Sequence, residues 1–206
     1  VITEQTILPK IHGKVKATAA ELVEAMDGKL SFEDRFLLGQ SLEHYRHSVN
    51  QVEEITVVIK QYVLERFERE YNLLIELPGV SAIVACVILS EIGPNVEAFK
   101  SQGNLASWAG LCPGSYESAG IKKSSHTTQG NKYLKSILFQ AGGTAGRSKD
   151  EAFHNLYARI SGRSSKMKAI IACAHKMIRV IYKILSTGEH YDAKKALGLR
   201  QQARAN

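Results

Sequence analysis

Apolar residues recur at steps of four and three along one stretch of the chain, between residues 36 and 74. They are Leu38, Leu42, Tyr45, Val49, Val52, Ile55, Ile59, Tyr62 and Phe67. Glu, Arg, Lys and Gln fill many of the positions between them, and no proline or glycine lies between Gly39 and Glu76. This pattern predicts a long helix that pairs with another helix, as a dimeric coiled coil or a helical hairpin. The alternative is a long helix that packs on its own domain.

The residues before this stretch contain two further helix signals. Residues 17–26, "ATAAELVEAM", predict a short helix. Ser31 followed by Asp34 has the spacing of a capping box, in which each residue bonds the backbone N–H of the other. We therefore expect the long helix to begin directly after Ser31.

Residues 73–94, "LLIELPGVSAIVACVILSEIGP", predict the end of a helix, a Pro78-Gly79 turn and a second, alanine-rich helix. Helix, tight turn and helix is the layout of a helix-hairpin-helix, which presents backbone N–H groups to a nucleic-acid phosphate. Ser81 stands near the place of a second glycine found in many such hairpins. The alternative is an ordinary corner between two helices.

The rest of the chain also shows helical periodicity, and no convincing strand alternation appears. Helices are expected over 101–111, 133–148, 151–160 and 166–187, the last capped by Ser164 or Ser165 and ended by Gly188. We predict an all-α fold, in which a long coiled-coil-like helix or helical hairpin is followed by a compact helical domain. The expected parts are a linker and dimerising helix (1–72), a C-terminal domain (73–192) and a polar tail (193–206).

Charge is distributed unevenly along the 206 residues. The net charge is +7, yet residues 1–70 hold nine Lys and Arg against twelve Asp and Glu. Residues 71–206 hold eighteen against eight, a net charge of +10. A basic excess in one part of a chain favours a polyanionic partner, most simply nucleic acid, over a charge that serves solubility alone.

The composition predicts a protein of a reducing compartment that holds no metal and does not span a membrane. Cys86, Cys112 and Cys173 are far apart and odd in number, so we expect a reducing compartment and no zinc site. His44 and His47 share a helix face, but no third metal ligand stands beside them. The longest apolar run, residues 82–89, is far short of a membrane span. We expect a soluble, cytoplasmic protein.

The polar stretch "GSYESAGIKKSSHTTQGNK", residues 114–132, is the candidate site for chemistry. Its serines are Ser115, Ser118, Ser124 and Ser125, and nearby cations are Lys122, Lys123, Lys132 and Lys135. Cations beside a helix N-terminus favour phosphate binding, and phosphoryl transfer depends mainly on positioning and positive charge. His126 is the only nearby imidazole and no His–Asp pair is evident, which argues against acyl transfer. By composition alone, a flexible basic loop is the simpler alternative.

Three motifs in order resemble one family. "LPGVSAIVACVILSEIG", "FKSQGNLASWAGLCPGSYESAGIKKSSHTTQGNKYLKSILFQAG" and "MKAIIACAHKMIRVIYKILSTGEHYD" resemble the C-terminal half of the IS110/IS116 class of insertion-sequence transposases, over about residues 73–192. In that class, a RuvC-like half with four acidic residues for divalent metal precedes a coiled coil and a helical domain with a nucleophilic serine. Its members act as DNA recombinases guided by a structured bridge RNA, and their composite site is assembled between subunits.

The resemblance assigns roles to residues of this chain. The "GL.P" element falls on Gly110-Leu111 and Pro113, and the serine on Ser118, two residues before Gly120 in "SAG". Ala119 replaces the usual first glycine of the serine motif. In the following "QGNKYLK" element, Gln129 stands where the family often has an arginine before the glycine. Lys135 replaces the final arginine of that element, which keeps the charge but loses the bidentate guanidinium fork. The expected nucleic-acid contacts are Pro78, Gly79, Ser81, Gly120, Lys122, Lys123, Gly130, Asn131, Lys132, Lys135, Lys166 and Lys168.

The resemblance also indicates what this sequence lacks. The first thirty residues hold no aspartates in a RuvC-like arrangement, so we expect Mg²⁺ and its carboxylates in a half outside this sequence, and no metal or cofactor within it. The implied function is the serine-bearing domain of a transposase that binds DNA and a guide RNA and self-associates through the long helix. The alternative is a non-catalytic, dimerising DNA- or RNA-binding module of helix-hairpin-helix type; a purely structural helical protein fits the charge asymmetry less well.

Overall fold

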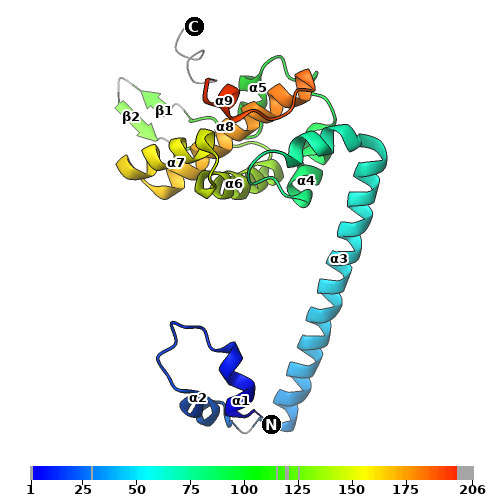
Figure 1. The fold of residues 1–206 in the computed structure, drawn as a ribbon, viewed down its shortest axis with the longest axis vertical. Coiled ribbons are helices and arrows are strands. Elements are labelled where there is room, and N and C mark those ends of the chain that lie inside the picture. Colours follow the sequence, from blue (N-terminus) through cyan, green and yellow to red (C-terminus); the bar gives the residue numbers. More distant parts are fainter. Residues whose placement is uncertain (1, 29, 115, 119–120, 125, 199–206) are drawn as a thin grey trace. The chain divides into compact units, whose positions relative to one another are not determined.

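The computed structural model describes residues 2–28, 30–114, 116–118, 121–124 and 126–198, with the backbone alone for 116–118 and 121–124 (Figure 1). The elements are, in chain order, α1 (Glu4–Ile7), η1 (Leu8–Lys10), α2 (Ala19–Met26), α3 (Phe32–Ile75), α4 (Ala82–Ile92), α5 (Gln102–Trp108), β1 (Tyr116–Ser118), β2 (Ile121–Ser124), α6 (Lys132–Arg147), α7 (Glu151–Arg163), α8 (Lys166–Thr187) and α9 (Ala193–Gly198). These helices confirm the all-α fold class. The chain divides into two compact units, Val1–Glu54 and Ile55–Asn206.

Local hydrogen bonds define the helix starts of the first unit. Thr18 and Glu21 cap α2 reciprocally, with Thr18 N donating to Glu21 Oε2 at 2.7 Å and Glu21 N to Thr18 Oγ1 at 3.3 Å. Ser31 and Asp34 do the same for α3, with Asp34 N donating to Ser31 Oγ at 3.0 Å. The predicted start of the long helix after Ser31 is therefore confirmed, and the short helix expected within 17–26 begins at Ala19. No described residue of this unit is buried.

Helix α3 spans 44 residues, in agreement with the long helix that the apolar pattern predicted. Its buried residues all lie toward the C-terminus, and they begin at Val63. Before that point, the large apolar side chains of α3 are exposed. The backbone leaves helical geometry at Phe67, with φ −139° and ψ 35°, which marks a kink. The helix thus packs on its own domain only near its C-terminus, and pairing through its exposed part stays a prediction.

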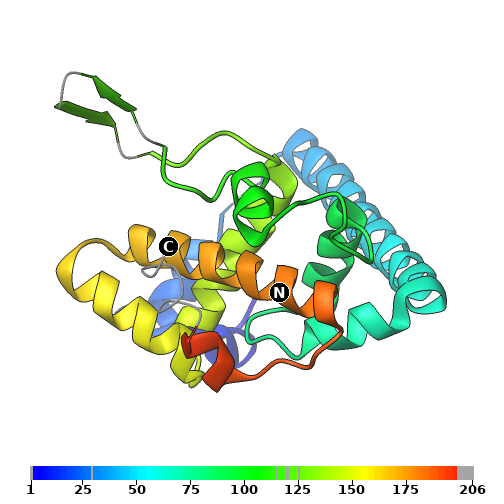
Figure 2. The same ribbon diagram turned by 90° about the horizontal axis from the view of Figure 1, so that it is seen from above.

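The core of the second unit surrounds α8 (Figure 2). Helix α8 buries apolar residues along its whole length, among them Met177, Ile178 and Ile181, and α5, α6 and α7 pack against it. Ser165 caps its start by accepting from Lys168 N at 3.3 Å. Gly188 ends it in the left-handed conformation, with φ 68°. Both ends agree with the sequence prediction.

Helix α6 approaches its neighbours closely, because glycines and alanines line it. A β-carbon on Gly142 would lie 2.6 Å from Ala174 N in α8, and one on Gly146 would lie 2.8 Å from Cδ2 of Tyr157 in α7. Gly79, in the turn between α3 and α4, has φ 83°, and a β-carbon there would lie 2.9 Å from Ala145 N in α6. The turn therefore requires a glycine for conformation and for space.

The polar stretch after α5 forms a short antiparallel hairpin that the sequence did not predict. Strand β1 pairs with β2, with Tyr116 opposite Ser124 and Ser118 opposite Ile121. The register shifts between Tyr116 and Glu117, where one strand holds an extra residue. The strands have three and four residues, which is too short for a detectable alternation of apolar and polar positions.

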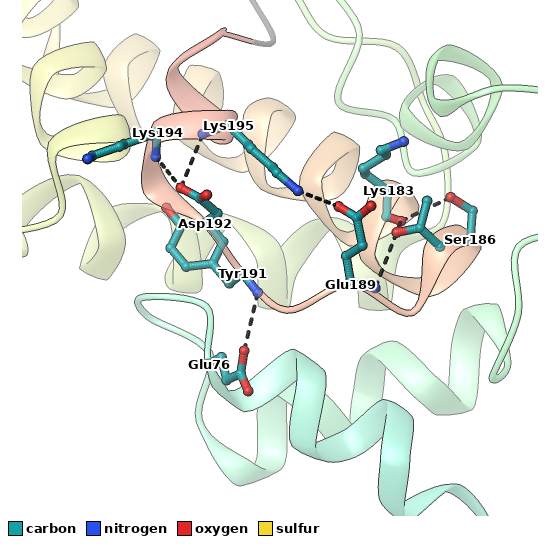
Figure 3. A network of polar contacts seen from close by, with 9 residues as sticks. Glu76, Lys183, Ser186, Glu189, Tyr191, Asp192, Lys194 and Lys195 are labelled. Atoms are coloured by element: carbon teal, nitrogen blue, oxygen red, sulfur yellow. Dashed lines mark hydrogen bonds and ion pairs between the residues drawn. The ribbon is translucent and has the colours of Figure 1, made fainter.

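The segment after α8 contacts two other helix ends, and Figure 3 shows the contact of Tyr191 with Glu76. Tyr191 N donates to Glu76 Oε2 at 3.2 Å, beside the C-terminus of α3, and His190 Nδ1 lies 2.7 Å from Glu76 Oε1. The Tyr191 hydroxyl donates at 2.9 Å to Asp150, which also caps α7 by accepting from Phe153 N. Burial and the bond to Asp150 raise the pKa of Tyr191, so it stays a neutral donor. The expected tail at 193–206 begins instead with α9.

Gly79→Ala should lower the free energy of unfolding by about 2–4 kcal/mol, since it adds left-handed strain and overpacks the turn against α6. Gly162→Ala is the matched control, because a β-carbon there meets nothing within 4 Å inside α7. It should raise stability by up to about 1 kcal/mol. Urea unfolding followed by circular dichroism measures both. Equal effects of the two substitutions would contradict the close approach of this turn to α6.

Candidate functional site: the loop between α5 and α6

Backbone hydrogen bonds close the base of the loop between α5 and α6. Thr128 N donates to Cys112 O at 3.1 Å, and Gly114 N donates to His126 O at 2.7 Å. Pro113 and Thr127 form an isolated antiparallel bridge between these bonds. The two ends of the loop therefore run side by side before the hairpin begins.

Two glycines bring the ends of the loop into backbone contact. Gly110 has φ 68°, and a β-carbon there would lie 2.9 Å from Gly130 N. A β-carbon on Gly130 would lie 2.5 Å from Trp108 O and 2.6 Å from Gly110 Cα. Because the two main chains touch at this point, neither position has space for a side chain.

Asn131 caps the start of α6. Its side-chain oxygen accepts from Tyr133 N at 3.0 Å and from Leu134 N at 2.9 Å, and its carbonyl accepts from Lys135 N at 2.9 Å. Its amide nitrogen donates to Glu91 of α4. Three of the first four N–H groups of α6 are thus bonded within the chain, which leaves this helix start little capacity for a phosphate.

The two lysines at this end of α6 have different surroundings. Lys135 is half-buried and donates its ammonium group to Thr128 O at 2.9 Å, so it holds the returning end of the loop. Lys132 is exposed, and its Nζ lies 4.9 Å from the ring centre of Tyr133. Trp108, 40% exposed, and Tyr133, 61% exposed, belong to the same base. Exposed aromatic rings beside a cation are suited to stacking on nucleic-acid bases.

The remaining loop residues lie on or beside the hairpin. Ser118 is the last residue of β1 and pairs with Ile121 of β2, while Lys122 and Lys123 are also in β2. Lys122 is opposite Glu117 in the strand pairing. Gly120 lies outside the described residues.

The predicted helix-hairpin-helix turn is at the other end of α6. Pro78 and Gly79 are half-buried, and Ser81 caps α4 by accepting from Val84 N at 3.4 Å. The turn packs against Ala141 and Ala145, which lie about 13–20 Å along α6 from its start, at 1.5 Å per residue. The structure therefore does not bring this turn and the loop together into one site.

Lys166 and Lys168 are exposed in the first turn of α8. In Figures 1 and 2, the hairpin projects on the side of the second unit where α7 turns into α8. These two lysines thus lie on the same side as the hairpin, in contrast to the α3–α4 turn.

A comparison with known families matches residues 71–158, from the end of α3 into α7, to the family described as Transposase IS116/IS110/IS902. This part of the chain is a transposase domain of that family. The match includes the α3–α4 turn, the whole loop and α6. It confirms the resemblance found in the sequence.

Three relatives support this assignment. The chain is 31% identical over 157 residues to "Putative transposase y4pF/y4sB" of Sinorhizobium fredii, covering 72% of this chain and 39% of that protein. It is 29% identical over 133 residues to "Insertion element IS110 uncharacterized 43.6 kDa protein" of Streptomyces coelicolor, covering 64% and 32%. It is 28% identical over 158 residues to the "Pilin gene-inverting protein" of Moraxella lacunata, covering 74% and 48%. The aligned region thus spans less than half the length of each relative.

Beneath the loop, the transposase domain holds a half-buried polar cluster that sequence reasoning missed. Cys112 Sγ lies 4.0 Å from Nε2 of His175 in α8, and Arg179 donates to Gln102 Oε1 at 3.2 Å. Burial, and then the charge of Arg179, lower the pKa of His175. Burial raises the pKa of the Cys112 thiol. His175 and Cys112 are 63 residues apart, so no local signal in the sequence pairs them.

The described part of the transposase domain offers no metal site and no membrane span. No group of three or more His, Cys, Asp or Glu side chains among the described residues is placed to hold a metal ion. Across the same residues, every helix is too short or too polar to span a bilayer.

His175 should make the stability of the transposase domain sensitive to acid. Its folded pKa lies below the ordinary value of 6.5, so the unfolded chain takes up a proton first as the pH falls. Stability is therefore full above that pH and declines below it. His175→Gln should lose less stability than the wild type between about pH 7.5 and 5.5, measured by urea unfolding.

His154→Gln, an exposed histidine on α7, is the control and should keep the decline of the wild type. If the stability of His175→Gln fell as steeply with decreasing pH as that of His154→Gln, burial of a neutral His175 would be the wrong account of the cluster.

Proposed function

We propose that the second unit is the DNA-binding, strand-transferring domain of a transposase, and that Ser118 is its nucleophile. The observation that carries the proposal is the position of Ser118 within a matched transposase domain. It is the last residue of β1, at the turn of a hairpin whose base is closed by backbone contacts. A nucleophile at a hairpin turn can meet a large substrate such as a DNA strand, while the clamped base limits its motion.

The proposed reaction exchanges one ester of phosphorus for another. Ser118 Oγ attacks a backbone phosphorus of DNA, and a Ser–O–P bond forms as the bond from phosphorus to a deoxyribose oxygen breaks. The serine proton ends on that leaving oxygen. A DNA strand end then attacks the same phosphorus, the Ser–O–P bond breaks, and the serine is freed. Since the number of phosphoester bonds is unchanged, the exchange needs no external energy source.

Positive charge around the loop supports the binding of phosphate. Lys122 and Lys123 follow the turn in β2, and Lys132 is exposed at the start of α6. Lys166 and Lys168 lie on the side where the hairpin projects. Because Asn131 already satisfies most N–H groups at the start of α6, these lysines, and not the helix terminus, supply the attraction in this proposal.

The proposed assembly also contains a metal site, a guide RNA and a second copy of this chain. Mg²⁺ would be held by carboxylates of a RuvC-like half and would polarise the phosphate. A structured guide RNA would select the target, and self-association through α3 would bring two copies to the DNA. The relatives named as a transposase and as a pilin gene-inverting protein support DNA rearrangement as the general activity.

The alternative is a binding module that uses the α3–α4 turn without chemistry at Ser118. Its support is the exposed Ser81 and the start of α4, where Ile83 is 53% exposed. However, Val80 N already donates to Leu77 O at 3.0 Å, and Gly79 faces α6. We therefore favour the loop as the reactive element, and the two functions differ in whether a covalent intermediate forms.

Ser118→Ala should abolish a covalent protein–DNA adduct in a longer protein that contains this domain together with its acidic half. The protein is incubated with its guide RNA, Mg²⁺ and DNA, then denatured and analysed for DNA-linked protein. Ser124→Ala, in β2 of the same hairpin, is the control and should retain the adduct. An adduct that persists in Ser118→Ala, or vanishes in both variants, would reject Ser118 as the nucleophile.

DNA affinity of the 206-residue chain should fall steeply with salt, because lysines that contact phosphates displace counterions. Lys132→Gln should reduce the slope of log affinity against log salt by about 1. Lys149→Gln is the control, since it is an exposed lysine beyond the opposite end of α6. Equal slopes for both variants would place the binding surface elsewhere.

A further inference from the structure

The exposed part of α3 carries a continuous apolar stripe. Its members are Leu38, Leu42, Tyr45, Val49, Val52 and Ile59, and between 36% and 65% of each is exposed. In heptad terms, Leu42, Val49 and Thr56 occupy a positions, and the other four residues of the stripe, Leu38, Tyr45, Val52 and Ile59, occupy d positions. Water-exposed apolar side chains in a stripe of this length favour coverage by another helix.

We propose that α3 pairs with α3 of a second copy of this chain in antiparallel orientation, with Val49 opposite Val52 of the second copy. The inference deepens the self-association proposed above and is independent of the chemistry at Ser118. Two of the central layers then consist of valines alone, one on each side of the two-fold axis. The charges and the sizes of the flanking residues select both the orientation and the register.

The charges beside the stripe favour the antiparallel orientation. Arg46 and Glu53 occupy successive e positions and are both exposed. In this register, Arg46 of each copy faces Glu53 of the other, so two opposite-charge pairs form. In a parallel, in-register pair, Arg46 would face Ser41 and Glu53 would face Ser48, and neither charge would gain a partner.

The sizes of the side chains agree with the same register. The large Tyr45 faces the small Thr56 of the second copy across the stripe. At the flanking g positions, the small Ser48 faces the large Ile55 of the second copy. A parallel pair would instead place Tyr45 against Tyr45 in one layer. Alternation of large and small residues across an interface allows dense packing.

Neighbouring antiparallel registers are disfavoured by like charges. A shift of one heptad toward the N-terminus brings Arg46 opposite Arg46 of the second copy. A shift of one heptad toward the C-terminus brings Glu53 opposite Glu53. Like charges that face each other across a helix pair are destabilising and set register. Val63, which is buried in its own unit, limits the pairing at that end.

Charge reversal tests the pairing in the whole 206-residue chain. Arg46→Glu and Glu53→Arg should each weaken the dimer about tenfold, which is about 1.4 kcal/mol, by sedimentation equilibrium. The double variant R46E/E53R should recover the wild-type dissociation constant, because each altered charge again faces its opposite. Glu54→Arg, one residue further on the outer face, is the matched control and should leave the dimer unchanged.

Cysteine cross-linking tests the orientation. Leu42 faces Ile59 of the second copy in the proposed pair, whereas 17 positions, or about 25 Å, separate them in a parallel pair. A mixture of Leu42→Cys and Ile59→Cys chains should form a disulfide-linked heterodimer under mild oxidation, and neither variant alone should cross-link. The wild type, whose three cysteines are buried or half-buried, shows the background.

The outcomes separate this inference from the proposed function. Cross-linking of Leu42→Cys alone would establish a parallel pair and overturn the inference, as would a monomeric wild type or the absence of rescue in the double variant. DNA affinity of the same variants is measured alongside. A dimer that forms as described but does not bind DNA would count against the proposed function alone.

Discussion

The direction of α6 is fixed by contacts that leave no space for a β-carbon. Gly142 meets the backbone of Ala174 in α8, Gly146 meets the ring of Tyr157 in α7, and Gly79 meets α6 from the α3–α4 turn. Three neighbours therefore approach one helix at main-chain distance. Such contacts tolerate little sliding or rotation, because movement in any direction creates an overlap or a void. The start of α6 and the end of the loop that leads into it are therefore held in place as well.

The loop motifs acquire a structural meaning from that arrangement. Gly110 and Gly130 allow the two ends of the loop to touch, and Asn131 both caps α6 and bonds Glu91. Lys135 bonds the backbone of Thr128. The resemblance placed Gly110 in the "GL.P" element and gave Gly130, Asn131 and Lys135 as expected nucleic-acid contacts. Their contacts within the chain shape the base of the loop.

Much of the helical organisation follows from local signals. Ser31 with Asp34, Ser165 and Gly188 mark helix ends through hydrogen bonds or backbone conformation that only a few residue types provide, so the sequence predicts them well. The position of Ser118 in a hairpin was not predictable in this way. Two strands this short carry no periodic pattern, and their pairing depends on a loop base closed by backbone contacts between residues 112–114 and 126–128.

The contacts that depend on the tertiary fold could also not be predicted from the sequence. His175 meets Cys112 across 63 residues, and Tyr191 meets Asp150 across 41. The closeness of Gly79 to α6, which separates the predicted turn from the loop, likewise requires the packed structure. The family resemblance identified which segments matter, since it draws on several motifs in order, but it gave no distances between them.

The closed base of the loop has a consequence for its length. Because Gly110 and Gly130 already hold the ends together, residues added between them change only the entropy of a tethered chain. That entropy varies slowly, so doubling the length of such a loop costs only about 0.6 kcal/mol. A change in the length of the loop should therefore destabilise the fold far less than a single methyl group added at Gly110 or Gly130. The length of the loop can therefore change while α5 and α6 keep their positions.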